Sequence, residues 1–317
     1  SQIRLSRRHF IRGATLIAAG AAMSSKPLLV AADRAKNTRV MPRVPGRFQL
    51  KMRQCRKPVP DGFAYDPTYS DVQWQVSETA IIICDMWADH PCKLAAQRVD
   101  AMAPWLNQVI SAARDHGALV IHAPSEGVKY YESTPFRGRI TSAPRLEPPV
   151  PIRARGQCDP AREPELPVIT NLRVENAPSG CDDPVVQPRR SPDRHQHPAI
   201  KMIGYDAVSE SGQEMYNLFG QEGIKNVVLT GVHTNMCVLG RSFGIRQWVY
   251  LGFNVALCRD LTDALYDPRD YPFVSHTRGT ELIIQHIEKY WCSSILRESL
   301  CQVVPGSNDP PTPASRS

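Results

Sequence analysis

Two continuous apolar runs, separated by an amphipathic segment, constrain the fold more than any other feature of the chain. They occupy residues 80–84 (AIIIC) and 118–122 (ALVIH). Runs of this kind are typical of strands buried on both faces of a parallel sheet. Between them, apolar residues recur at helical spacing from Val99 to Ala113, and His116-Gly117 ends the helix. The pattern predicts a right-handed βαβ unit.

The same alternation continues toward the C-terminus. The predicted elements are a helix at 207–222, a strand at 227–231, a helix at 235–248, a strand at 254–258 and a helix at 279–291. This order predicts the α/β class: a three-layer sandwich with a mainly parallel central sheet and helices on both faces. The chain has no glycine-rich phosphate-binding motif, so no phosphate-cradling loop is indicated.

Proline content divides the chain into parts. Residues 144–200 carry 12 of the 28 prolines, and we interpret them as an insertion over the edge of the site. A disordered surface excursion is the alternative. Residues 33–75 show little periodicity and are interpreted as a linker and an arm lying over the folded domain. That domain is expected at 76–300, with a disordered tail at 301–317.

The positive charge is concentrated at one end. The net charge is +7, yet residues 1–57 hold 14 Lys or Arg and a single acid, Asp33. The remainder of the chain is therefore acidic on balance. A nucleic-acid partner for the folded domain has no support in this distribution.

The N-terminus has the pattern of an export signal. Ser6, the pair Arg7-Arg8, Phe10, Ile11 and Arg12 precede a short apolar stretch and small residues up to Ala32. This run resembles a twin-arginine signal peptide, here residues 1–32. The resemblance implies periplasmic or extracellular localisation after export in the folded state. The apolar stretch is too short for a stable membrane span. A basic tail is the alternative interpretation.

Cysteine spacing gives little guidance. The nine cysteines include no CxxC pair, which makes a disulfide framework or a structural zinc site a poor interpretation. One or two disulfides remain compatible with export, and at least one thiol is expected to stay free.

Three residues are candidates for chemistry. Asp85 ends the first strand, at the edge of the sheet where open α/β proteins bind ligands. Cys237 is expected in the first turn of a helix, where a thiolate is stabilised. Lys201 follows the insertion, and a lysine near a thiol would lower its pKa. Taken singly, each also has an ordinary structural interpretation: a cap or ion-pair partner, a small packing residue and a surface lysine.

Together these residues resemble the pattern of the isochorismatase-like cysteine hydrolases, which include nicotinamidases and N-carbamoylsarcosine amidohydrolases. The resemblance covers about residues 76–292. Its strongest part is residues 228–238 (VLTGVHTNMCV), which resemble the family signature around the nucleophile, and residues 84–86 (CDM) match the first motif. The match at Lys201 is the loosest. The resemblance implies a catalytic triad of Asp85, Lys201 and Cys237, a small-molecule substrate and homo-oligomers.

The implied mechanism is nucleophilic catalysis at a small amide or related C–N bond. Asp85 accepts the thiol proton of Cys237, assisted by Lys201, and later protonates the leaving group. Backbone N–H groups of Cys237 and of the turn at Val232 and His233 hold the oxyanion. In the family this turn contains a non-proline cis peptide bond, expected here between Val232 and His233.

The chain also departs from the family pattern. Trp87 stands where members carry Gln or Asn, and we expect it to line the pocket together with His90, His122 and Asn235. The metal-binding Asp-x-His spacing of nicotinamidases is absent. No metal and no other cofactor is therefore expected. A site built from His122, Glu126 and His90 is the alternative, and a hydrogen-bonded strand-end histidine is the preferred interpretation of His122.

Two other function classes compete with a hydrolase. One is a catalytically silent relative that serves as a binding or scaffold domain. The other is a thiol redox protein, which is disfavoured because the sequence places no resolving cysteine near Cys237.

Overall fold

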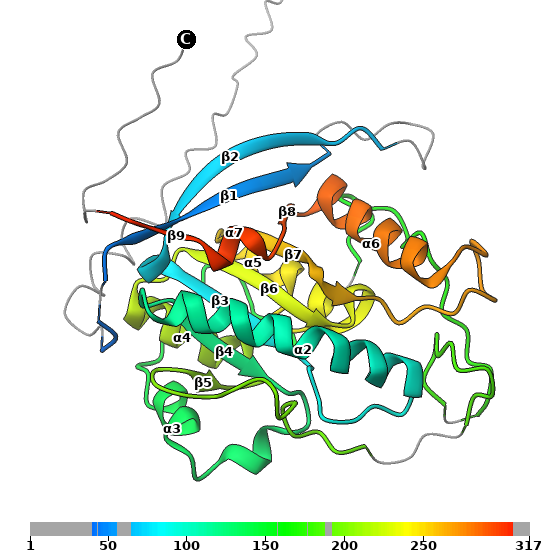
Figure 1. The fold of residues 1–317 in the computed structure, drawn as a ribbon, viewed down its shortest axis with the longest axis horizontal. Coiled ribbons are helices and arrows are strands. Elements are labelled where there is room, and N and C mark those ends of the chain that lie inside the picture. Colours follow the sequence, from blue (N-terminus) through cyan, green and yellow to red (C-terminus); the bar gives the residue numbers. More distant parts are fainter. Residues whose placement is uncertain are drawn as a thin grey trace, which may run out of the picture.

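The computed structural model describes residues 40–42, 44–55, 65–156, 158–175, 177–187 and 192–306. The predicted signal peptide, residues 1–32, lies outside these described residues. Within them the chain forms one mixed sheet with the strand order β2-β1-β8-β7-β6-β3-β4-β5, and β9 pairs with β1 (Figure 1). The strand bounds are β1 Gly46–Gln54, β2 Thr68–Gln75, β3 Thr79–Cys84, β4 Leu119–Ala123, β5 Ala207–Val208, β6 Asn226–Val232, β7 Asn254–Asp263, β8 Ser293–Ile295 and β9 Val303–Pro305.

The central part of the sheet is parallel. β3 pairs with β4 on one side and with β6 on the other, and β7 extends the sheet beyond β6. Every residue of β3, β4 and β6 is buried. This burial on both faces explains why these strands appear in the sequence as continuous apolar runs. The α/β class with a mainly parallel sheet, predicted from the alternation of elements, is confirmed.

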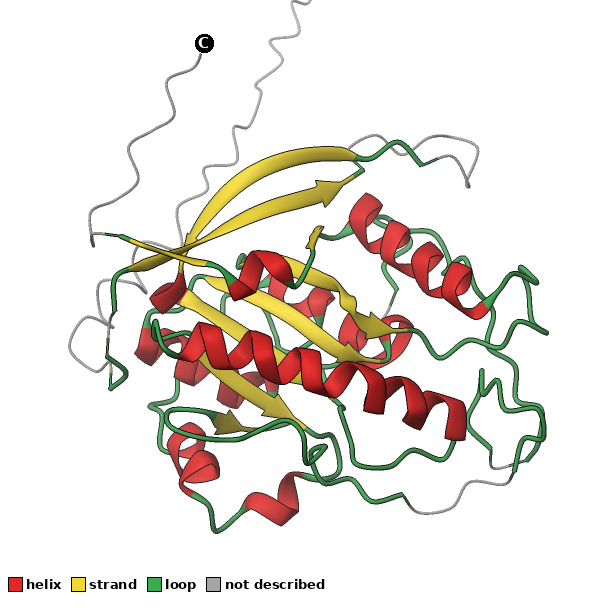
Figure 2. Ribbon diagram, viewed as in Figure 1, coloured by secondary structure: helices red, strands yellow, loops and turns green. Residues whose placement is uncertain are grey.

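Helices cover both faces of the sheet. Figure 2 shows their arrangement around the strands. The α-helices are α2 Lys93–Arg114, α3 Pro135–Thr141, α4 Gly212–Glu222, α5 Ile245–Tyr250, α6 His276–Tyr290 and α7 Glu298–Cys301. Short 3-10 turns lie at Val76–Glu78 and Val128–Tyr131, and a π-helical turn lies at Thr234–Val238.

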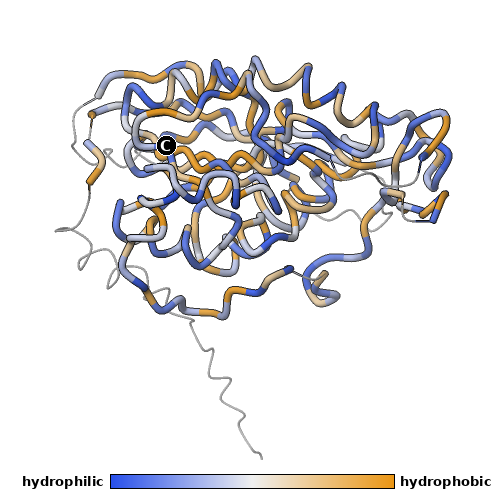
Figure 3. The backbone as a smooth tube through the Cα atoms, turned by 90° about the horizontal axis from the view of Figure 1, so that it is seen from below, coloured by the Kyte–Doolittle hydropathy of each residue, from blue (hydrophilic) through white to orange (hydrophobic). Residues whose placement is uncertain are grey.

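The two faces have separate cores. Apolar residues of α2 and α7 pack with β1 and one face of the central strands. Apolar residues of α3, α4, α5 and α6 pack on the opposite face. In Figure 3 the hydrophobic colour is concentrated along the central strands. Burial of these two apolar faces against helices is the main stabilising contribution to such a three-layer fold.

The prediction of a linker and an arm at residues 33–75 is corrected for Gly46–Gln54 and Thr68–Gln75, which form strands of the sheet. β1 and β2 pair along their full lengths as an antiparallel ribbon, from Arg47 opposite Gln75 to Gln54 opposite Thr68. β1 also pairs with β8, so the folded domain begins before residue 76. The predicted tail is corrected in the same way, since Val303 to Pro305 pair with β1. Residues 307–317 lie outside the described part of the chain.

The insertion has no helix and no ladder of its own in the described parts of residues 144–200. It is nevertheless well packed, with Val168, Ala177, Cys181 and Ile200 buried. Its Glu163 carboxylate is fully buried against α5 and α6: Oε1 lies 2.6 Å from Arg246 Nη2, and Oε2 accepts hydrogen bonds from His286 and Trp291, each at 2.7 Å. The described part of the insertion is therefore anchored to the domain.

In the described part of the chain, no helix combines the length and apolar character needed to cross a bilayer.

Candidate active site

Asp85 lies directly after β3, at the carboxyl edge of the parallel strands. Its backbone has φ 49°, a left-handed conformation that residues with a side chain seldom adopt. Its N–H donates to the carbonyl of Ala123 at the end of β4 (3.1 Å). The residue is only 2% exposed. The end of the first strand therefore presents a carboxyl group in a buried setting.

Gly231 brings the neighbouring strand close to this point. It pairs with Cys84 and has φ +92°, and a Cβ atom there would lie 2.0 Å from the carbonyl oxygen of Cys84. Only glycine fits so close an approach. The peptide bond between Val232 and His233 is cis, at the position that the resemblance implied. The π-helical turn at 234–238 follows and carries Cys237.

Arg241 is the cation beside the thiol. Its Nε lies 3.4 Å from Cys237 Sγ, and its backbone N–H donates to the carbonyl of Cys237 (3.1 Å). This backbone bond spans four residues, as in one turn of an α-helix, so both side chains lie on the same side of the turn. Two further groups act on the sulfur: the thiol of Cys84 and the carboxyl of Asp85 both help to lower the pKa of Cys237.

The Asp85 carboxyl favours its protonated form. Its Oδ1 accepts a hydrogen bond from the N–H of Ser125 (2.7 Å), which stabilises the charged form. Burial has the larger effect and raises the pKa of Asp85 well above its usual range, and the neighbouring sulfur of Cys237 raises it further. This side chain therefore holds a proton more readily than an ordinary aspartate.

The Cys237 thiol has the opposite tendency. A hydrogen bond from Cys84 lowers its pKa to about 5, opposed by burial and aided by the positive charge of Arg241. Burial raises the pKa of Cys84 well above its usual range, so that thiol keeps its proton. Asp85 and Cys237 thus differ in tendency: the carboxyl favours its protonated form and the thiol favours its charged form. Arg241 places a positive charge beside the sulfur.

The rings of Trp87, His90 and His233 pack in a row next to the π-helical turn that carries Cys237. His90 contacts His233 edge-on, with ring centroids 5.0 Å apart, and stacks with Trp87 at 5.9 Å. Burial lowers the pKa of His233 to about 3, so its imidazole is neutral at physiological pH. The guanidinium of Arg194, from the insertion, lies 4.2 Å from the centroid of Trp87. The structure thus brings Trp87 and His90 to the same edge as Asp85.

The structure does not bring Lys201 to this group. Its side chain is exposed, and Nζ donates to the carbonyl of Pro198 (2.9 Å). Its backbone N–H donates to the side chain of Asn107, on the outer side of α2 (2.9 Å). Loop geometry after the insertion carries Lys201 outward, and Arg241 occupies the place next to the thiol. The prediction of Lys201 as the electrostatic helper is corrected accordingly.

Two predicted pocket residues have structural partners instead. Asn235 exchanges two hydrogen bonds with the backbone of Leu265, each 3.0 Å long, and so fixes the segment after β7. His122 is fully buried in β4, where Nε2 lies 3.0 Å from Asp206 Oδ2. This agrees with the interpretation of His122 as a hydrogen-bonded strand-end histidine.

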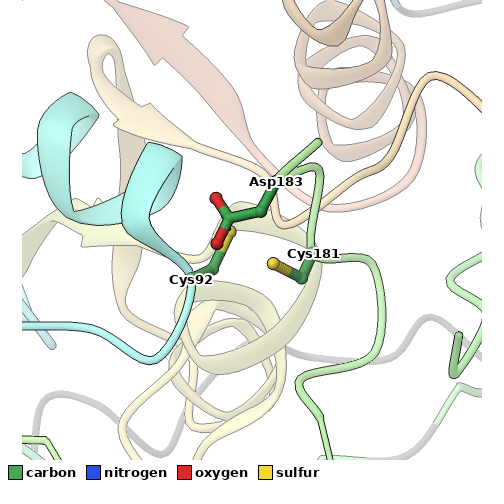
Figure 4. A group of neighbouring side chains, drawn as sticks. All are labelled: Cys92, Cys181 and Asp183. Carbon is green, nitrogen blue, oxygen red and sulfur yellow. The ribbon is translucent and has the colours of Figure 1, made fainter. Parts of the chain in front are cut away.

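The residues of the alternative metal site are engaged separately. Glu126 is paired with Arg194 (3.2 Å), and His90 Nδ1 accepts from the N–H of Cys92 (3.0 Å). In the described residues, a group of His, Cys, Asp or Glu side chains close enough to hold a metal occurs elsewhere, at Cys92, Cys181 and Asp183 (Figure 4).

The insertion reaches this edge of the sheet in two places. Near its start, Gly156 donates to the carbonyl of Gly240 (2.7 Å), next to Arg241. Near its end, Ala88 donates to the carbonyl of His195 and His197 to that of Met86, both at 2.8 Å. These contacts agree with the interpretation of the insertion as a cover over the edge of the site.

Sequence reasoning did not place Arg241 beside the thiol, and it missed Cys84. The spacing of four residues between Cys237 and Arg241 was the available signal for the first. Cys84 appeared only as the last apolar residue of a strand, and its contact with Cys237 depends on how β3 and β6 pair. The argument against a redox protein was that no resolving cysteine stands near Cys237. It did not consider Cys84, whose thiol acts on the pKa of Cys237 in the folded chain.

A buried carboxyl, a thiol and a guanidinium at the carboxyl edge of a parallel sheet define the class: an α/β protein with a candidate cysteine nucleophile. The family model described as Isochorismatase domain matches residues 79–273. The chain therefore belongs to the isochorismatase family. No protein with a curated description matches it.

Several solved structures are similar to this chain at low identity. A cysteine hydrolase from Pseudomonas syringae pv. phaseolicola 1448A has 13% identity and a TM-score of 0.43, with 72% of this chain and 92% of that chain covered. An isochorismatase from Pseudomonas putida KT2440 has 11% identity and a TM-score of 0.39, covering 71% and 90%. The N-carbamoylsarcosine amidase from Thermoplasma acidophilum has 13% identity and a TM-score of 0.32, covering 61% and 87%.

Proposed function

We propose that the protein is a cysteine hydrolase that cleaves a small amide or a related C–N bond through a thioester intermediate on Cys237. One observation carries the proposal: Arg241 Nε lies 3.4 Å from Cys237 Sγ. The buried carboxyl of Asp85 also acts on the pKa of this thiol. A thiolate held beside a protonated carboxyl combines a nucleophile with a general acid.

The proposed reaction begins with the proton already on Asp85. The Cys237 thiolate attacks the substrate carbonyl, and backbone N–H groups of the 232–237 turn receive the developing oxyanion. Asp85 then gives its proton to the leaving nitrogen, and the amine departs. In the second half, Asp85 removes a proton from water, and the resulting hydroxide releases the acid and regenerates the thiolate. Arg241 takes the electrostatic role first assigned to Lys201.

Export remains part of the proposal. The pattern around Arg7-Arg8 supports it, and the residues concerned lie outside the described part of the chain. N-terminal sequencing of protein produced in bacterial strains with and without the twin-arginine translocase tests it. A homo-oligomeric state is likewise proposed and is tested by light scattering.

The experiment that tests the function is a substrate screen with trapping of the intermediate. Small primary amides and ureides are incubated with the wild-type protein and with Cys237→Ala, and ammonia release is followed. The peptide carrying Cys237 is then searched by mass spectrometry for an acyl adduct. Turnover that is lost in Cys237→Ala, with the adduct in wild type, supports the proposal. A Cys237→Ala variant that retains turnover would exclude it, and a thiol of ordinary reactivity without turnover would favour the scaffold alternative.

A further inference from the structure

A second pair of cysteines lies at the start of α2, apart from the proposed nucleophile. Cys92 is the N-cap residue of α2, and Cys181 belongs to the insertion. Both are buried, at 0% and 2% exposure. The two sulfurs and one carboxylate oxygen of Asp183 all lie within 4.8 Å of one another. Figure 4 shows the sulfur of Cys92 beside the Asp183 carboxylate, with the sulfur of Cys181 across from it.

Asp183 holds this part of the insertion against the helix. Its Oδ2 accepts from the N–H of Lys93 (3.0 Å), and its Oδ1 accepts from that of Leu94 (2.9 Å). These are free N–H groups of the first turn of α2, so the carboxylate caps the helix. Asp182 adds an ion pair with Arg98, in the second turn of α2 (2.9 Å). Cys181 is thereby kept opposite Cys92 by contacts that do not involve sulfur.

We infer that Cys92 and Cys181 form a disulfide bond that ties the insertion to the start of α2 when a disulfide oxidant is present. The two thiols come from segments far apart in the sequence, and they are placed within reach by an independent capping interaction. The inference does not depend on the proposed hydrolase activity.

The chemistry of the pair suits this bond. The neighbouring Cys92 thiol lowers the pKa of Cys181, and we assign Cys181 as the attacking thiolate. With glutathione disulfide as oxidant, Cys181 attacks one sulfur, forms a mixed disulfide and releases one glutathione. Cys92 then loses its proton and attacks Cys181, which releases the second glutathione. Two protein thiols are oxidised, one glutathione disulfide is reduced, and the two protons end on the two glutathione thiols.

A metal ion explains the geometry less well. Structural zinc sites almost always use four protein ligands, and this group has three among the described residues. The Asp183 oxygens also already accept two backbone hydrogen bonds. Zinc binding is therefore treated as the competing outcome.

The bond would act next to the proposed site. The N–H of Cys92 donates to His90 Nδ1, and His90 contacts His233 of the cis peptide. A disulfide bond at Cys92 therefore restrains the segment between Asp85 and α2, which carries the rings of Trp87 and His90.

The experiment uses the purified full chain, fully reduced and freed of metal. One sample is incubated folded in glutathione redox buffers, and a second is refolded in the same buffers, so that burial cannot block access. Free thiols are alkylated, and the protein is digested with trypsin and chymotrypsin. Cleavage after Trp87 separates Cys92 from Cys84. The expected result is a cross-linked peptide of Cys92 and Cys181, absent in Cys181→Ser and present in the control Cys158→Ser, which changes another cysteine of the insertion.

A second readout needs no variant. The oxidised wild-type protein is expected to unfold at a temperature about 5–10 °C higher than the reduced protein, because the bond closes a long loop. Two results would overturn the inference. One is complete alkylation of both cysteines in folded and refolded samples at every glutathione ratio. The other is the stoichiometric binding of added Zn²⁺ that protects both thiols, with no cross-linked peptide formed.

Discussion

The guanidinium of Arg241 lies against the sulfur of Cys237, with Nε 3.4 Å from Sγ, and both residues belong to one turn after β6. This relationship changes the expected role of the basic group in the site. An arginine keeps its charge at any physiological pH, whereas a buried lysine can lose its proton. Arg241 therefore places a fixed positive charge beside the sulfur of Cys237.

Substituting Lys201 and Arg241 one at a time shows which of them supplies the positive charge beside the thiol. Lys201→Met is expected to leave hydrolysis and thiol reactivity unchanged, because its Nζ is bonded to the carbonyl of Pro198 on the outer side of α2. Arg241→Met is expected to lower kcat/KM by about 100-fold or more, as the loss of one charged hydrogen-bond partner does in comparable sites. Steady-state kinetics of both variants test this, with Arg241→Lys as the conservative control. Equal losses in the Lys201 and Arg241 variants would contradict the assignment.

Asp85→Asn separates proton donation from thiolate formation. Asparagine resembles the protonated carboxyl in shape and charge but cannot give a proton to the leaving nitrogen. We expect turnover to fall by about 100- to 10,000-fold, while the alkylation rate of Cys237 at pH 7 stays within a few-fold of wild type. Parallel measurement of both rates checks this. If Asp85→Asn also abolishes the rapid alkylation of Cys237, the proposal that Asp85 carries the proton in the free protein is wrong.

His276 should make stability depend on pH. Its Nε2 lies 2.9 Å from Asp263 and its Nδ1 3.2 Å from Asp182, and these partners raise its pKa to about 9 although burial opposes the shift. A pKa raised in the folded state contributes stability that is complete below about pH 6.5 and is lost as the pH rises toward 9. The contribution is at most about 3 kcal/mol.

The measurement is the free energy of unfolding in urea between pH 6 and pH 9.5, for wild type and His276→Gln. Wild type should lose stability across this window, and the variant should show a flatter dependence. Parallel curves for the two proteins would rule out His276 as the cause.

Glu163 is expected to hold the insertion to the domain. Its carboxylate lies 2.6 Å from Arg246 Nη2 and also accepts from His286 and Trp291. Glu163→Gln leaves the buried Arg246 charge without its partner, which costs about 3–5 kcal/mol. Glu165→Gln, an exposed position two residues on, is the matched control. Urea denaturation of both variants checks this, and a loss below about 1 kcal/mol for Glu163→Gln would show that the ion pair is not an anchor.

The fold was predictable where burial is two-sided. β3, β4 and β6 are buried along their whole length, so their apolar runs identify them without knowledge of their partners. β1 was missed although Phe48, Leu50 and Met52 alternate with polar residues and are all buried. The density of arginine, lysine and proline around them obscured this alternation, which is the usual signal of a strand with one buried face.

The candidate site was predictable only in part. Asp85 and Cys237 follow strand ends and sit in recognisable motifs, so their position at the sheet edge follows from the topology. Lys201 was misplaced because the path of a long loop cannot be derived from its sequence. Contacts such as that of Cys84 with Cys237 arise from the pairing of distant strands, and a single sequence does not encode them locally.

The most direct test of the central claim is the pH dependence of alkylation at Cys237. The tryptic peptide 226–241, which becomes 226–246 in Arg241→Met, contains no other cysteine, so its labelling reports this thiol alone. In wild type we expect a rate constant that is nearly constant from pH 6 to pH 8. The rate constant should decrease only when the pH is lowered past about 5, the pKa of Cys237. In Arg241→Met the midpoint should move upward. A wild-type rate that instead climbs toward the free-thiol pKa of about 8.5, with no change in Arg241→Met, would contradict the account.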